Sequence, residues 1–129
     1  WSVDRYRGKT DVDWRFESTN GFPRFPLPIE AACFRIAQEA MTNAVRHGHA
    51  QRITVGCHTD ADSVRVAVFD DGVGFAESNE PATHQGLGLL GMKERAAALG
   101  GQLRIESSAG GGTLIEVIFR RDPPLENGE

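Results

Sequence analysis

Four polar residues recur along one predicted helix at spacings that suit the binding of a metal ion and phosphate groups. Glu39 and Asn43 are four residues apart and therefore lie side by side on the helix surface. Arg46 and His47 follow one helical turn later. A carboxylate, an amide oxygen, a guanidinium and an imidazole in this arrangement can hold a hydrated Mg²⁺ and the phosphates that it bridges, because Mg²⁺ takes few protein oxygens. Taken alone, the pattern also fits a solvated polar helix face.

A carboxylate stands at the end of a predicted strand, directly before two spaced glycines. The run DDGVG begins at Asp70 and contains Gly72 and Gly74. By the period-two alternation of a strand, Asp70 lies on the same face as the valines of that strand, which should be the covered face. A carboxylate there needs hydrogen-bond donors and is a candidate to bind a ligand that bears N–H groups. An aspartate that caps its own Asp-Gly turn fits Asp71 better than Asp70.

A second glycine-rich segment, HQGLGLLGM, contains Gly86, Gly88 and Gly91 at the spacing of a dinucleotide-binding fingerprint. That fingerprint requires a tight turn between strand and helix, whereas residues 71–87 form a long polar loop before the next predicted helix. The segment instead predicts a phosphate site, because the free N–H groups and the dipole of a helix N-terminus attract anions. A flexible loop that leads into a glycine-tolerant helix start is the alternative.

A hydroxyl can join these groups from the last predicted strand. Thr113 follows the run GGG and shares its strand parity with Ile115 and Val117, so it can point into the same cavity as Asp70. Three separate segments then supply a carboxylate to read a base, a polar helix strip for a metal and a glycine loop for phosphate. Their coincidence favours a nucleotide site, and the lack of a G-x-x-x-x-G-K-[ST] pattern excludes a P-loop.

The elements that must position these residues follow from hydrophobic periodicity. The predicted strands are residues 11–18, 52–58, 63–70, 102–108 and 113–120, and the predicted helices are residues 29–46 and 88–99. The first strand alternates Trp14 and Phe16 with charged neighbours and is expected to be half-buried. This order predicts the α/β class, as a two-layer α/β sandwich whose mixed, mostly antiparallel sheet has its helices on one face. We expect one domain over residues 1–120 and a flexible tail over residues 121–129.

Composition excludes several functional classes. The chain has 129 residues and a net charge of −4, which argues against direct binding of nucleic acid, since such domains usually carry a basic face. No apolar run approaches the ~20 residues that cross a bilayer, and the first residues include neither a signal core nor an initiating Met. We therefore expect a piece of a longer protein. Cys33 and Cys57 lie in apolar segments without metal-site spacing and are interpreted as buried thiols in a reducing compartment.

The motifs together resemble a known family. The segments EAMTNAVRH, DDGVGF, GLGLLGM and GGGT are similar, in this order, to the N, G1, G2 and G3 boxes of the Bergerat-fold ATPases. That group contains DNA gyrase, heat-shock chaperones, mismatch-repair ATPases and histidine kinases. The segments RIAQEAMTNAVRHG and GLGLLGMKERAAALGG are most similar to the catalytic ATP-binding domain of sensor histidine kinases whose partners are NarL-type response regulators. The resemblance covers about residues 29–120.

The resemblance implies a role for each residue at the phosphate end of the site. It implies that Asn43 coordinates Mg²⁺, that Glu39 beside it polarises water or the metal, and that Arg46 and His47 approach the phosphates. It also implies ATP contacts from the glycine loop and the helix start, at Gly86, Gly88 and Leu89.

The resemblance further implies how the base is recognised. Asp70 would accept a hydrogen bond from the amino group of adenine, Gly72 and Gly74 would shape the base pocket, and Thr113 would support the adenine site. Residues 75–85 would form the ATP lid, which closes when the nucleotide binds.

Two features depart from the family pattern. The lid segment contains no Lys or Arg, so a cation for the γ-phosphate must come from Arg46, His84 or Lys93. None of the four histidines stands in the helical His-Asp setting that the family uses as phosphoacceptor. The chain is therefore expected to lack the histidine that is phosphorylated.

The resulting prediction is a single ATP-binding catalytic domain of a histidine kinase, with ATP and Mg²⁺ as cofactors. Its expected partners are the phosphoacceptor and dimerisation domain of the same kinase and a NarL-type response regulator, with no direct contact to nucleic acid. The expected location is the cytoplasm, with the membrane reached only through other parts of the parent protein. A serine kinase of the anti-sigma-factor type on the same fold, and a non-catalytic nucleotide-binding module, remain alternatives.

Overall fold

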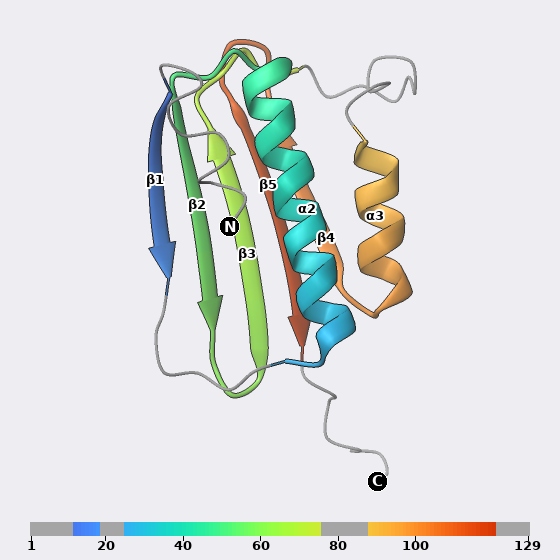
Figure 1. Ribbon diagram of the computed structural model, residues 1–129. Helices are drawn as coiled ribbons and strands as arrows, with labels where there is room; N and C mark the ends of the chain where they lie inside the picture. Colours follow the sequence, from blue (N-terminus) through green and yellow to red (C-terminus); the bar gives the residue numbers. More distant parts are fainter. Residues whose placement is uncertain (1–11, 19–24, 76–87, 121–129) are drawn as a thin grey trace, which may run out of the picture.

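The computed structural model describes residues 12–18, 25–75 and 88–120. Within these ranges the chain forms one sheet and two helices (Figure 1). The strands are β1 (Asp13–Ser18), β2 (Arg52–Thr59), β3 (Ser63–Asp70), β4 (Gln102–Ser107) and β5 (Thr113–Arg120), and the helices are α2 (Leu27–Arg46) and α3 (Leu89–Ala98). The predicted elements all exist, and their bounds differ from the prediction by one or two residues at several ends.

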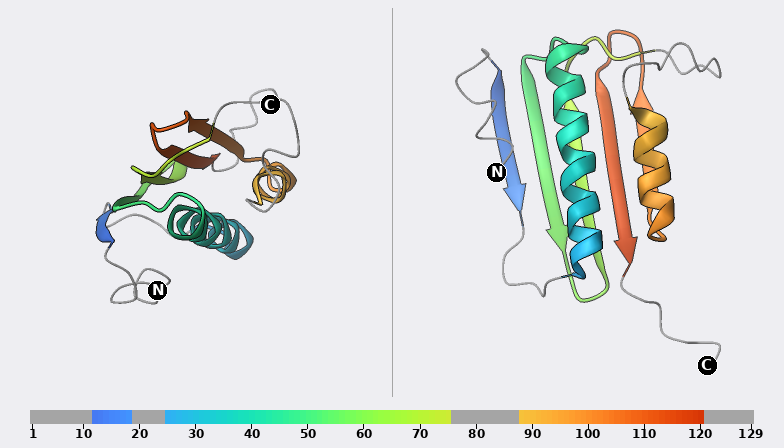
Figure 2. Two further views of the ribbon diagram at one scale, coloured as in Figure 1. Left: turned by 90° about the horizontal axis from the view of Figure 1, so that it is seen from above. Right: turned by 45° about the vertical axis from the view of Figure 1, so that its right-hand side comes forward.

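The sheet is mixed, with the strand order β1-β2-β3-β5-β4. Strand β1 pairs with β2 in parallel, and every other pair of neighbours is antiparallel. Both helices lie on the same face of the sheet, as the views from above and from the side show (Figure 2). The predicted two-layer α/β sandwich is confirmed.

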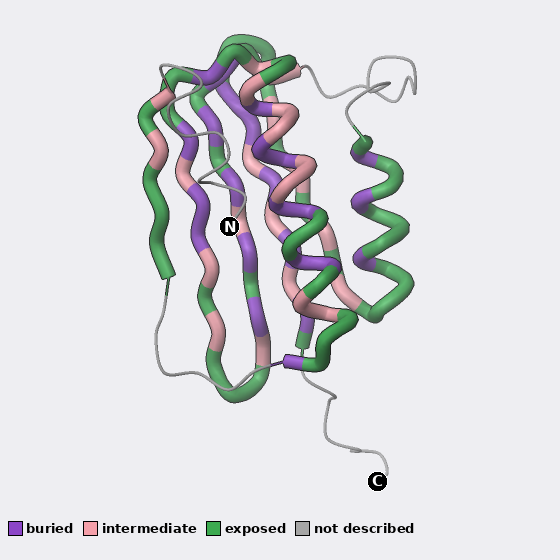
Figure 3. Tube along the Cα trace, viewed as in Figure 1, coloured by how far each residue is buried: buried purple, intermediate pink, exposed green. Residues whose placement is uncertain are grey.

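Helix α2 provides most of the second layer, because its apolar residues recur along one stripe. Buried positions on this stripe include Ile36, Ala40 and Met41, and they face buried positions of the strands (Figure 3). The predicted start at residue 29 was late, since the helix begins at Leu27 with a proline in its first turn. Proline is tolerated there because the first N–H groups of a helix have no partner within it. Neither described helix combines the length and hydropathy needed to cross a membrane.

Strand β1 is less buried than its alternating sequence predicts. Trp14 is partly buried, but Phe16 remains 48% exposed. Helix α2 packs mainly on β3 and β5 and less on β2, so the edge strand β1 lies beside the covered area. Alternation alone therefore predicted the strand and the partial burial of Trp14 correctly, and the burial of Phe16 wrongly.

The two cysteines differ in their burial. Cys33 on α2 is buried, and desolvation raises the pKa of its thiol to about 12. Cys57 on β2 is half-buried, and desolvation also raises its pKa. Both side chains are thiols held in the neutral form at physiological pH, as expected for core rather than reactive cysteines, although Cys57 is more accessible than predicted.

The end of β3 is tied to the loop that follows α2. One oxygen of the Asp71 carboxylate accepts hydrogen bonds from the backbone N–H groups of Gln51 and Arg52, each at 2.9 Å. The N–H of Val73 donates to the carbonyl of Gly48 at 2.9 Å. A Cβ added to Gly72 would overlap that same carbonyl, so the two segments approach as closely as they do because Gly72 has no side chain. This junction fixes the point at which β3 ends.

The close approach at Gly72 predicts opposite effects for two glycine substitutions. Gly72→Ala should lower the free energy of unfolding by about 1–3 kcal/mol, the usual cost of overpacking. Gly91→Ala is the matched control, because it lies in α3 and nothing lies within 4 Å of a Cβ added there. That substitution should raise the free energy of unfolding by about 0.5–1 kcal/mol, since alanine favours a helix over glycine. Urea unfolding measures both, and equal effects of the two substitutions would contradict the packing described.

The hydrogen bonds of Asp71 predict a pH-dependent contribution to stability. The N–H of Arg52, aided by that of Gln51, holds the pKa of Asp71 below its usual range. The contribution is therefore complete above the unfolded value of about 3.9 and is lost as the pH falls through the lower folded value. Asp71→Ala should cost about 1 kcal/mol at pH 7, as for the loss of a capping side chain.

Urea unfolding at pH 7 and at successively lower pH checks this expectation. The deficit of Asp71→Ala relative to the wild type should shrink below pH ~3.9. Asp71→Asn keeps an acceptor oxygen and serves as the control, so it should cost less than alanine at pH 7. A deficit that is independent of pH would show that the carboxylate charge does not stabilise the junction.

Candidate functional site

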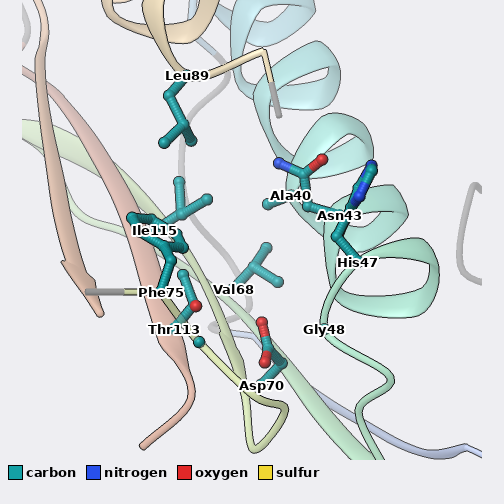
Figure 4. A pocket seen from close by; sticks show the side chains of 11 residues that line it. Ala40, Asn43, His47, Gly48, Val68, Asp70, Phe75, Leu89, Thr113 and Ile115 are labelled. Atoms are coloured by element: carbon teal, nitrogen blue, oxygen red, sulfur yellow. The ribbon is translucent and has the colours of Figure 1, made fainter. Parts of the chain in front are cut away.

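A cavity of about 220 Å³ opens between α2, the start of α3 and the adjoining ends of β3 and β5. Polar groups line one part of it and apolar side chains the rest (Figure 4). The lining residues are Ala40, Asn43, His47, Gly48, Val68, Asp70, Gly74, Phe75, Leu89, Thr113 and Ile115. The cavity thus joins the predicted base-reading carboxylate, the polar helix strip and the start of the second helix.

Asp70 is the buried carboxylate of this cavity. It is 5% exposed and shares the inner face of β3 with Val64, Val66 and Val68, as its parity predicted. One of its oxygens accepts a hydrogen bond from the N–H of Gly72 at 2.8 Å. Desolvation raises the pKa of Asp70, and the hydrogen bond from Gly72 opposes this shift. The carboxylate therefore retains acceptor capacity that faces the cavity.

The turn after β3 differs from the prediction. Asp70 itself makes the hydrogen bond to the residue two positions on, while Asp71 binds the backbone of Gln51 and Arg52. The expectation that Asp71 rather than Asp70 caps the Asp-Gly turn is therefore wrong. The reason is tertiary, because the loop after α2 brings two N–H groups to Asp71 that its own turn would not provide.

Thr113 lies beside Asp70 across two paired strands. The two residues are direct partners in the antiparallel register of β3 and β5, and both are buried on the inner face. Side chains in this position have their Cβ atoms roughly 4.5–5.5 Å apart. Figure 4 shows both side chains at the same end of the cavity, away from Leu89. The predicted inward parity of Thr113 is confirmed.

The polar strip of α2 is divided between two environments. Asn43 and His47 line the cavity, whereas Arg46 is exposed and does not line it. Glu39 is half-buried and lies against Gly88, since a Cβ added to Gly88 would be 2.5 Å from its Oε2 atom. A carboxylate at this position is favourable for the N-terminus of α3, which has no side-chain cap of its own.

The glycines also separate into different roles. Gly74 lines the cavity with φ +63°, and a Cβ there would overlap the carbonyl of Ser108, so only glycine fits without strain. Gly72 does not line the cavity but packs on Gly48 beneath it. Gly88 has φ +69° and precedes α3, whose first residue, Leu89, lines the cavity.

Several predicted residues lie outside the described part of the chain. They are Gly86, His84 and the lid segment after Phe75. Lys93, the other cation considered for the γ-phosphate, is exposed on α3 and does not line the cavity.

Ser107, the last residue of β4, was not among the predicted site residues. Its hydroxyl contacts the Thr113 hydroxyl at 2.8 Å and receives the backbone N–H of Phe75 at 2.8 Å. Strand parity could have found it, because Leu103, Ile105 and Ser107 alternate with exposed residues along β4. Gly48, just after the end of α2, also lines the cavity and was not among the predicted site residues.

Comparison with known proteins gives the family. Residues 29–123 match the family model described as histidine kinase-, DNA gyrase B- and HSP90-like ATPase. The chain is 34% identical over 118 residues to the signal transduction histidine-protein kinase/phosphatase DegS of Bacillus subtilis, covering 91% of this chain and 31% of DegS. It is 42% identical over 93 residues to the nitrate/nitrite sensor protein NarQ of Escherichia coli, covering 71% of this chain and 16% of NarQ.

A solved structure supports the same assignment. The ATP binding domain of PrrB from Mycobacterium tuberculosis superposes with a TM-score of 0.63 at 25% identity, over 95% of this chain and 88% of that one. The fold is thus the predicted Bergerat fold. The chain spans about a third of DegS and about a sixth of NarQ, so it corresponds to one part of these larger proteins. The resemblance found in the four motifs is confirmed, and the chain belongs to the family of histidine kinase-, DNA gyrase B- and HSP90-like ATPases.

Proposed function

We propose that the cavity binds Mg-ATP and that the chain donates the γ-phosphoryl group to a histidine on a separate dimerisation domain of a two-component sensor kinase. The observation that carries the proposal is the buried carboxylate of Asp70 at one end of a cavity that leads to the N-terminus of α3. A buried acceptor at one end and a phosphate-binding helix start at the other match the two ends of a nucleotide.

The base would bind at the end that holds Asp70 and Thr113. The ionised carboxylate accepts a hydrogen bond from the exocyclic amino group of adenine, and the Thr113 hydroxyl lies next to it. Val68 and Ile115 supply apolar walls for the flat ring, and Gly74 leaves room for its edge. Gly72 would act indirectly, because its hydrogen bond to Asp70 fixes the orientation of the carboxylate.

The phosphates would extend towards α3. The N–H groups at Gly86, Gly88 and Leu89 would bind their oxygens, and His47 would approach from α2. Glu39 already places a negative charge against Gly88, so phosphates at this helix start require a cation between them and the carboxylate. The fit to Mg²⁺ is good, because the Asn43 amide and the Glu39 carboxylate are oxygen ligands of the kind that Mg²⁺ selects.

A small set of protein ligands also agrees with Mg²⁺. Among the described residues, no group of three or more His, Cys, Asp or Glu side chains is arranged to hold a metal. Mg²⁺ commonly uses one or two protein oxygens and completes its shell with water and substrate phosphates. When bound, the ion neutralises charge on the β- and γ-phosphates.

Catalysis in this proposal consists mainly of positioning and charge neutralisation. A nitrogen of the acceptor histidine attacks the γ-phosphorus, the bond to the β-phosphate oxygen breaks, and ADP leaves. Glu39 would hold a water or the metal beside the reacting phosphate, and Asn43 would fix the metal. Arg46 is exposed and does not line the cavity, and in this proposal it would reach the phosphates from the end of α2 to supply the cation that the lid sequence lacks. A NarL-type response regulator would then receive the phosphoryl group in the cytoplasm.

Transfer of labelled phosphate tests the function. The 129-residue chain with Mg²⁺ and γ-labelled ATP should bind the nucleotide without acquiring a stable, acid-labile label, because its histidines lie outside an acceptor helix. Addition of a separate helical hairpin that carries the His-Asp pair of the parent kinase should produce the label on that hairpin. Label on the chain alone would contradict the proposal.

The same experiment separates the two alternative functions. Label on a serine of an anti-anti-sigma protein, but on no histidine, would indicate the serine kinase. Binding of ATP without any transfer would indicate a non-catalytic module.

Two substitutions should separate base recognition from metal binding. Asp70→Ala should weaken ATP binding by ~1.5–3 kcal/mol, the range for a hydrogen bond to a charged group, and reduce the preference for ATP over GTP. Asp70→Asn should cost less, because its amide can turn an oxygen towards the same donor. The wild type should prefer ATP by at least about tenfold, since guanine presents a carbonyl oxygen to the carboxylate.

Asn43→Ala is the matched control for this experiment. It should remove the Mg²⁺-dependent part of ATP binding and leave the preference for ATP over GTP and the affinity for adenosine nearly unchanged. Calorimetric titration with both nucleotides and adenosine, with and without Mg²⁺, measures each effect. If Asp70→Ala binds ATP as tightly as the wild type, the base does not bind at this end of the cavity.

A further inference from the structure

The Ser107 hydroxyl is the centre of a hydrogen-bonded cluster next to the proposed base site. Its oxygen lies 2.8 Å from the backbone nitrogen of Phe75, 2.9 Å from the carbonyl oxygen of Gly112 and 2.8 Å from the Thr113 hydroxyl. These partners come from the segment after β3 and from the start of β5, so one side chain joins three segments. Phe75 and Thr113 both line the cavity, whereas Ser107 itself does not.

The number of available protons fixes the direction of each hydrogen bond. A serine hydroxyl has one proton to donate and two lone pairs to accept. The Gly112 carbonyl can only accept, so the Ser107 proton points to it. The Phe75 N–H can only donate, so it uses one lone pair of Ser107. The contact with Thr113 then uses the second lone pair, and the proton between the two hydroxyls belongs to Thr113.

This arrangement determines what Thr113 can offer to a ligand. Its only proton is directed at Ser107, so its oxygen can accept but not donate towards the cavity. Asp70, its cross-strand partner, is also an acceptor when ionised. The polar end of the cavity therefore presents two neighbouring acceptors. A group with two N–H bonds on one nitrogen satisfies both, whereas a carbonyl oxygen in the same position satisfies neither.

We infer that Ser107 is a positioning residue for base selectivity, which fixes Thr113 as an acceptor beside Asp70 so that the pocket selects a 6-amino purine over a 6-oxo purine. The inference rests on the proposed function, because it assumes that the purine binds at Asp70. Ser107 does not touch the base in this account, and it acts by holding the proton of Thr113 away from the cavity.

The test compares the affinity for ATP with that for inosine triphosphate, which carries an oxygen in place of the 6-amino group. In Ser107→Ala the Thr113 hydroxyl loses its acceptor and can rotate to donate to the 6-oxo group. The selectivity ratio, defined as the Kd for inosine triphosphate divided by the Kd for ATP, should therefore fall by about threefold to tenfold, which corresponds to one hydrogen bond. Loss of the hydrogen bond from the Phe75 N–H should weaken the binding of both nucleotides equally, so it should leave this ratio unchanged.

Three further variants make the result specific. Ser108→Ala removes the exposed hydroxyl of the next residue and should leave the ratio at the wild-type value. Ser107→Thr keeps a hydroxyl and should largely restore the ratio. In a Thr113→Val background, where no hydroxyl remains to be oriented, Ser107→Ala should leave the ratio unchanged, as a double-mutant cycle requires when one residue acts through the other.

The outcomes distinguish this inference from the proposed function. If the wild type binds ATP and Asp70→Ala weakens it, but Ser107→Ala leaves the ratio unchanged, the role of Ser107 is structural and the inference is overturned. An effect of Ser107→Ala that persists in the Thr113→Val background would also overturn it. If the wild-type chain binds neither nucleotide, the proposed function itself fails.

Discussion

The site depends on the burial of one carboxylate at the end of a strand. Asp70 is 5% exposed, and a carboxylate removed from water needs hydrogen bonds to remain stable. The N–H of Gly72 supplies one within the chain, and the adjoining cavity gives access for a ligand that supplies another. Because desolvation raises the pKa of Asp70, a donor in the cavity also favours the ionised form. Burial of the carboxylate destabilises the empty site. For the same reason, it increases the binding free energy of a ligand that donates a hydrogen bond to Asp70.

The surrounding architecture serves to keep that carboxylate inside the protein. Both helices cover one face of the sheet, so every second residue of β3 and β5 faces them (Figure 2). The strand register then sets Thr113 beside Asp70 on the inner face, near the end of α2 that bears Asn43 and His47. Polar groups collect at this end because β3 ends there and β5 begins there, so the valines of the inner face give way to Asp70 and Thr113. The chemistry is thus located where the sheet core stops.

Glycines allow the backbone segments around the site to approach one another. Gly72 packs on the carbonyl of Gly48, and Gly74 packs on the carbonyl of Ser108, both without room for a Cβ. These contacts tie the segment after β3 to the end of α2 on one side and to the β4–β5 turn on the other. The glycines of the DDGVG run therefore contribute to the site by close packing, which positions Asp70 at the end of β3 and Gly74 in the wall of the cavity.

Local patterns in the sequence determined the elements, the fold class and the inward direction of Asp70 and Thr113, because strand and helix periodicity fix which face each side chain occupies. The four ordered motifs determined the family. Tertiary structure decided the partners of these side chains: Asp71 bonds to the loop after α2, Glu39 lies against Gly88, and Arg46 lies outside the cavity. It also decided that Ser107 meets Thr113, since this contact requires the register of β4 on β5. Periodicity predicts the face of one helix or strand on which a side chain lies. A hydrogen bond between two elements also needs a fixed distance between them, and only the packing of the sheet and helices establishes that distance.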